Sequence, residues 1–226
     1  VLIFLAGWMY WYAALPLMLL TAAGLAPRKC KEPQTRDSLP AFPLFTRSSF
    51  LALAAFAALM TLSGWGEWVN QHPDHIVKNA CLRELVASPW PVIFPDGNML
   101  VYNTGFWLVP ALAGKLAGLD AARVLVVLWG TWGLFLAWLW LCVFSGHRSL
   151  LLALLMAAFG SLLNFQCWLG LDLFRLHYFG TAEQIMCSAN ASIPVLLFFI
   201  FLASGRMPLP WIPLLFAATA FYSPLA

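Results

Sequence analysis

Long apolar stretches without charged residues in their interiors constrain the fold of this 226-residue chain more than any other feature. A helix needs roughly 20 apolar residues to cross a hydrocarbon core of about 30 Å. Runs that approach or reach this length recur along the sequence, at residues 1–25, 50–64, 100–116, 124–144 and 150–169. With 62% hydrophobic residues, 9% charged residues and 12 Trp, the composition excludes an ordinary soluble domain. The sequence therefore predicts an all-α, polytopic transmembrane protein with about six or seven apolar segments.

The apolar segments near the end of the sequence are less regular. The run 193–202 would be about 15 Å long as a helix, so it spans a bilayer only if the helix begins near Ile185. The last run starts at Pro210 and is interrupted by further prolines. Because the sequence begins without Met and ends inside an apolar run, we interpret residues 1–226 as a single transmembrane domain from a longer protein.

Residues 26–47 form a basic loop between the first two apolar runs. They hold five Lys and Arg against two acidic residues, a net charge of +3. Because Lys and Arg between spans mark the cytoplasmic side, this loop is expected in the cytoplasm and the second run is expected to lead outward. A multi-pass location in the inner or plasma membrane follows.

The loop at 65–99 is therefore expected outside the cytoplasm, and it carries the residues best suited to chemistry. Its acidic residues outnumber Lys and Arg, and they are Glu67, Asp74, Glu84 and Asp96. Proline suits the first turn of a helix and the helix dipole favours an acidic residue there, so Pro73 and Asp74 predict a helix start. Lys78 follows Asp74 by four residues, which makes the two side chains neighbours.

Two interpretations of this helix start remain open. In the first, Asp74 and Lys78 form a weak, solvated ion pair without a functional role. In the second, the carboxylate orients a hydroxyl or a metal, while Lys78, Arg83 and His75 stabilise a departing phosphate electrostatically. Trp90 could stack on a sugar ring, although an interfacial anchor accounts for it equally well.

Short motifs in and after this loop support the second interpretation. They read KNACLRELV at 78–86, PWPV at 89–92 and LVYNTGFWLVPALAGKL at 100–116. With the outward run and the acidic loop before them, they resemble the C-type integral-membrane glycosyltransferase superfamily over roughly residues 48–203. The resemblance implies transfer of a sugar from a polyprenyl-phosphate donor to an acceptor on the extracytoplasmic side. It implies that Asp74, or Glu67 as runner-up, acts as the base or as a metal ligand.

A second polar segment at 170–192 is similar to the second acidic element of that superfamily. Its candidate substrate-binding residues are Asp172, His177 and Glu183. Simple alternation of the spans puts this segment in the cytoplasm, whereas one half-helix among the preceding runs would put it outside with the loop at 65–99. The sequence has no DxD, DxE or ExD pair, so the requirement for a divalent metal stays open.

Other functions compete with a glycosyltransferase. A transporter or flippase usually carries ionisable residues within its spans, and the interiors of the main apolar runs lack them. A non-catalytic membrane subunit would use the Trp- and Pro-rich loop at 65–99 as a docking surface. The net charge of +3 is spread over several loops, which does not suggest nucleic acid.

Overall fold

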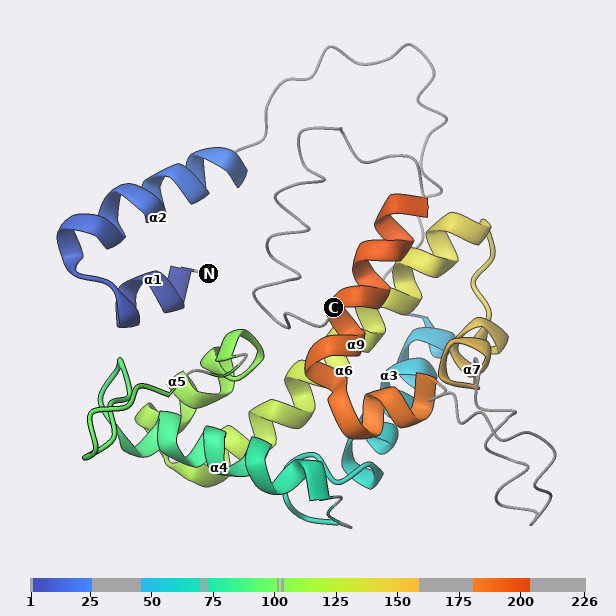
Figure 1. The fold of residues 1–226 in the computed structure, drawn as a ribbon. Helices are drawn as coiled ribbons and strands as arrows, with labels where there is room; N and C mark the ends of the chain where they lie inside the picture. Colours follow the sequence, from blue (N-terminus) through green and yellow to red (C-terminus); the bar gives the residue numbers. More distant parts are fainter. Residues whose placement is uncertain are drawn as a thin grey trace, which may run out of the picture.

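The computed structural model describes residues 2–25, 46–69, 73–100, 104–158 and 181–203, together with Gln71 and Tyr102. All named elements in this part of the chain are helices, which confirms the all-α prediction (Figure 1). One of them, α6 (Leu119–Ser145), is long and apolar enough to cross a membrane. The other apolar helices within these ranges are shorter, so the described residues do not confirm about six or seven spans.

Helix α6 is the central element, and α3 (Arg47–Leu62) and α9 (Thr181–Ala203) pack along it (Figure 1). With 27 residues, α6 is about 40 Å long. Two glycines make the close contacts possible, because a Cβ at Gly130 would meet Met60 of α3 and a Cβ at Gly133 would meet Ile193 of α9. Small residues at such positions let helices approach closely, as is typical of packing in membranes.

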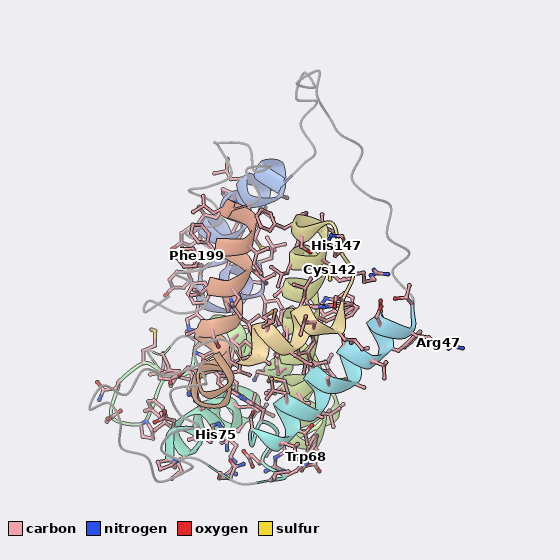
Figure 2. All side chains as sticks on the ribbon, turned by 90° about the vertical axis from the view of Figure 1, so that its right-hand side faces the viewer. Arg47, Trp68, His75, Cys142, His147 and Phe199 are labelled. Atoms are coloured by element: carbon pink, nitrogen blue, oxygen red, sulfur yellow. The ribbon has the colours of Figure 1, made fainter. Side chains whose placement is uncertain are left out.

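Helices α3 and α6 run in opposite directions. Arg148, just beyond α6, donates a hydrogen bond of 3.2 Å to Thr46, which caps the start of α3 by accepting from the Ser49 amide. At the other end, Gly66 lies against Val127 near the start of α6. Figure 2 shows the same polarity, with His75 and Trp68 at one end of the described helices and Phe199 and His147 toward the other.

Helices α4 (Pro73–Ala87) and α5 (Leu108–Ala117) cover the beginning of α6, and the short 3₁₀ helix η1 (Thr104–Phe106) precedes α5 (Figure 1). The predicted helix start at Pro73 is confirmed, with Asp74 in the first turn. The chain turns from α5 into α6 at Gly118, whose φ of 92° suits glycine because it has no Cβ.

The structure does not confirm the prediction that residues 100–116 return through the membrane. Helix α5 has 10 residues, about 15 Å, half of what a span needs. At its end, Lys115 Nζ donates to the Ser88 carbonyl, and Arg123 in the first turns of α6 bonds to Glu67. The turn at 115–123 therefore lies at the same end of α6 as the loop at 65–99, whereas alternation had placed it at the opposite end.

The first apolar run also differs from the prediction. Residues 1–25 were expected as one span, but the structure divides them into α1 (Leu2–Trp8) and α2 (Trp11–Leu25), which contact each other. Helix α7 (Leu150–Ala158) packs on α6 and α9 and is described over nine residues. The basic loop at 26–47 lies outside the described residues up to position 45, and the last apolar run lies wholly outside them.

Candidate functional site

A buried polar pair on the inner face of α4 is the centre of the candidate site. His75 is 1% exposed and Lys78 is 5% exposed, and their spacing of three residues puts them on one face of the helix. Lys is rarely buried without partners, so the burial of Lys78 requires specific interactions with its surroundings. The outward positions between them carry Ile76 and Val77, which are exposed. The helix thus turns these two polar residues inward, which composition alone does not predict.

Trp65 joins this pair to α9. Its ring centre lies 5.3 Å from that of His75 and 5.7 Å from Lys78 Nζ, within the range of a cation–π contact. Its indole N–H donates a hydrogen bond of 2.9 Å to the carbonyl of Ile185 in α9. Trp65 is itself 2% exposed, so it forms an internal wall of the site that is attached to three elements.

Helix α9 is irregular where it meets Lys78. Ser188 has φ −150° and ψ 53° inside the helix, and a non-helical residue of this kind interrupts the ladder of backbone hydrogen bonds. Lys78 Nζ donates to Ser188 Oγ at 3.4 Å. The helical stretch that follows the break therefore begins beside a buried cation. A helix start and a cation together favour an anion.

Asp74 lies on the outer rim of this site, exposed in the first turn of α4. Tyr102 is half-buried close to it. Burial raises the pKa of the Tyr102 hydroxyl, and negative charge at Cys81 and Asp74 raises it further.

Glu67 and Arg83 belong to a separate ion-pair cluster. Glu67 Oε2 accepts hydrogen bonds from Arg83 Nη2 at 2.6 Å and from Arg123 Nε at 3.1 Å, and Arg123 also pairs with Asp120. Burial raises the pKa of Glu67, but the hydrogen bonds from the two arginines outweigh it and hold this pKa below its ordinary value. Arg83 thus points at Glu67 from an exposed position on α4, whereas Lys78 is buried.

Trp90 occupies a packing position between α1 and α5. Its ring centre is 5.2 Å from that of Trp8 and 5.1 Å from Lys115 Nζ, and its indole N–H donates to the carbonyl of Leu85. These contacts are made by the same ring for which stacking on a sugar was one of two interpretations. The structure therefore gives Trp90 a role in holding α1 against the loop at 65–99.

The second polar segment meets the first one at this site. Asp172 and His177 lie outside the described residues, and Glu183 lies in the first turn of α9. The contacts of Trp65 with Ile185 and of Lys78 with Ser188 bring the beginning of α9 to the same end of α6 as the loop at 65–99. This relative placement is the one expected from the half-helix alternative that the sequence left open.

The sequence did not point to Ser188 or Tyr102 as site residues, and it suggested Trp65 only as one of several tryptophans that could stack on a sugar. Tyr102 stands in one of the motifs quoted above, which was a usable signal, but nothing in the sequence around Ser188 predicts a break. Within the described ranges no group of three His, Cys, Asp or Glu side chains could hold a metal ion.

Comparison of the chain with protein-family models, with curated proteins and with solved structures gave no match. The function therefore has to be argued from the geometry of α4, α9 and Trp65 and from the chemistry of their side chains.

Proposed function

We propose that this protein is a membrane glycosyltransferase that moves a sugar from a polyprenyl-phosphate donor to an acceptor at the extracytoplasmic surface. The observation that carries the proposal is the contact between α4 and α9. It sets the buried cation of Lys78 beside the break at Ser188, with a carboxylate, Asp74, one helical turn away at the rim. A cation in the interior and a base at the surface match the two halves of a sugar transfer.

The donor half of the reaction needs positive charge where a phosphate departs. Lys78 and His75 are both almost fully buried, and charge interactions are stronger there than in water because the surroundings polarise less. The hydroxyl of Ser188 and the helix that begins beside it add hydrogen-bond donors. These groups would hold the phosphate, while the apolar surroundings exclude water that would hydrolyse the donor.

The acceptor half needs a base. The acceptor oxygen forms a bond to the anomeric carbon of the sugar, and its proton goes to the carboxylate of Asp74. The bond between the anomeric carbon and the phosphate oxygen breaks, and its electron pair leaves with the phosphate. Asp74 is suited to this role because it is exposed to the side from which an acceptor arrives. Glu67 is less suited, since two arginines hold its carboxylate.

The arrangement of helices supports a location in the membrane. Helix α6 has the length and apolarity of a span, and α3 and the part of α9 after Ser188 lie along it as shorter apolar helices. In the proposed orientation, α4 and α5 cover the extracytoplasmic end of α6, where the phosphate of a lipid-linked donor would lie at headgroup level. The basic loop at 26–47 then falls on the cytoplasmic side.

The test compares three variants in membrane vesicles supplied with a radiolabelled polyprenyl-phosphate hexose. Asp74→Asn and Lys78→Met are expected to abolish release of the labelled sugar from the lipid, and both proteins should still insert and fold. Asp96→Asn is the matched control, because it removes the same charge from an exposed position in the same loop. Release at the wild-type rate by Asp74→Asn and Lys78→Met would refute the proposal.

A transporter or flippase is the second candidate, and the break in α9 is the observation that favours it. Transporters bind substrates at discontinuous helices near the middle of the bilayer. Here the break lies close to α4, which covers one end of α6, so it suits a surface enzyme better. Uptake of a lipid-linked or free sugar into proteoliposomes, without any sugar transfer, would reverse this ranking.

A further inference from the structure

The turn between α3 and α4 has an unusual backbone. Gly64, Gly66 and Glu67 have φ values of 92°, 89° and 67°. Glu67 is the one residue other than glycine with a positive φ in the described part of the chain. Side chains disfavour this region, and such a conformation persists only where the surrounding structure holds it. The contacts of Glu67 identify what holds it.

Those contacts come from two different helices. Arg83 of α4 and Arg123 of α6 both donate to the same carboxylate oxygen of Glu67, whose side chain is 10% exposed. Hydrogen bonds between charged groups are stronger and more directional than neutral ones. The carboxylate therefore ties the turn to α4 and α6 at once.

The same turn carries Trp65, two residues before Glu67. The indole of Trp65 contacts His75, Lys78 and the carbonyl of Ile185, and its ring centre is 5.6 Å from that of Trp107. Gly64 and Gly66 flank Trp65 in positive-φ conformations, so the direction of the indole depends on the local backbone. A change at Glu67 is thus expected to reach His75 and Lys78 through Trp65.

We propose that Glu67 is a positioning residue, whose ion pairs with Arg83 and Arg123 hold the turn so that Trp65 keeps Lys78 and His75 against the break in α9. This role replaces the base or metal-ligand role that the sequence suggested for Glu67. The placement of Trp65 stands on the contacts alone, and only its effect on turnover rests on the proposed function. No atom of Glu67 has to touch the substrate.

The neutral variant Glu67→Gln tests whether the ion pairs of Glu67 position Trp65 or stabilise only the turn itself. Glutamine keeps the shape of the side chain and can offer its carbonyl oxygen to both arginines, but that oxygen carries no charge, so both hydrogen bonds are weakened. Asp120→Asn is the matched control. It removes the carboxylate of Asp120, the other ion-pair partner of Arg123, from a side chain that is 92% exposed. The hydrogen bonds of Arg83 and Arg123 to Glu67 stay in place.

The first measurement is ¹⁹F NMR of the purified full chain labelled with 5-fluorotryptophan. The resonance that disappears in Trp65→Phe reports on Trp65. Glu67→Gln is expected to shift or split that resonance and to leave the resonance of Trp132, half-exposed on α6, unchanged. Asp120→Asn should leave both resonances where they are. If Glu67→Gln does not fold, Arg83→Gln makes the same test, because it removes one of the two arginines from Glu67.

The second measurement is sugar release from the polyprenyl-phosphate hexose as a function of pH. Loss of positioning is expected to lower kcat about tenfold to a hundredfold without moving the acidic limb of the pH profile. A shifted acidic limb in Glu67→Gln would show that Glu67 is itself the base and would overturn the proposal. An unchanged Trp65 resonance in the folded variant would also overturn it. If Glu67→Gln shifts the Trp65 resonance but the wild-type protein transfers no sugar, the proposed function is refuted and the positioning role stands.

Discussion

Replacing Gly114 by alanine tests the placement of α5, on which the corrected arrangement of the loop at 65–99 depends. A Cβ at Gly114 would lie 2.5 Å from Val86 Cγ2 of α4 and 2.8 Å from Ala122 Cβ of α6. Both distances are shorter than carbon atoms tolerate, so α5 cannot accept the methyl group without moving away from a neighbour. If α5 instead crossed the membrane apart from α4, the same methyl group would meet lipid.

The size of the effect follows from two opposing contributions. Inserting a methylene into a packed core typically costs about 1–3 kcal/mol. Alanine in place of glycine favours a helix by about 1 kcal/mol. Val86 could change its rotamer, but Ala122 Cβ is fixed to the backbone of α6. The overpacking cost should therefore lie in the upper part of its range, about 2–3 kcal/mol. We therefore expect Gly114→Ala to destabilise the protein by about 1–2 kcal/mol.

Gly130→Ala is the matched control, and its expected outcome is less obvious. A Cβ there would come even closer to a neighbour, but the neighbouring atoms are Cε and Sδ at the end of the flexible Met60 side chain. A thioether can rotate out of the way. The gain in helix propensity should then offset most of the cost, and Gly130→Ala is expected to be nearly neutral.

The assay is thermal unfolding of both variants in the same detergent. The quantity measured at each temperature is the fraction of protein that remains monodisperse. For a chain of this length, about 1 kcal/mol corresponds to a Tm change of about 2–4 °C, so Gly114→Ala should lower the Tm by about 2–8 °C. A Tm for Gly114→Ala equal to or above that of Gly130→Ala would contradict the packing of α5 between α4 and α6.

Three further predictions concern acid, thiol reactivity and sidedness. Because the pKa of Glu67 lies below its ordinary 4.5 in the folded protein, its ion pairs contribute fully above pH 4.5. That contribution is lost as the pH falls through the folded pKa, so the stability difference of about 1–2 kcal/mol between wild type and Glu67→Gln should close in acid. Burial raises the pKa of Cys81 to about 12, so Cys81 should resist maleimide at pH 8 until the protein is denatured. In sealed vesicles, cysteines introduced at Asp96 and Lys115 should be labelled from the same side and one at His147 from the other. Labelling of Asp96→Cys and His147→Cys from one side, with Lys115→Cys labelled from the other, would restore the alternating topology.

Local features of the candidate site were predictable because they depend on neighbours in the sequence. Pro73 and Asp74 predicted the start of α4, since the fixed φ of proline and the helix dipole act within one turn. The runs at 50–64 and 124–144 correspond to α3 and α6 with shifted ends. The burial of Lys78 was not predictable, because it depends on Trp65 and Ser188, which are distant in the chain.

The amino-acid sequence by itself determined that the described chain folds as helices, that the run at 124–144 is long and apolar enough for a membrane span, and where the charged residues gather. Only the tertiary structure decided that α5 turns back along α6 and that α9 begins beside α4. The physical reason is that an apolar run has the same composition whether lipid or protein covers it. Its partner is selected by contacts such as Gly114 with Val86 and Glu67 with Arg123, which join residues far enough apart that no local pattern records them.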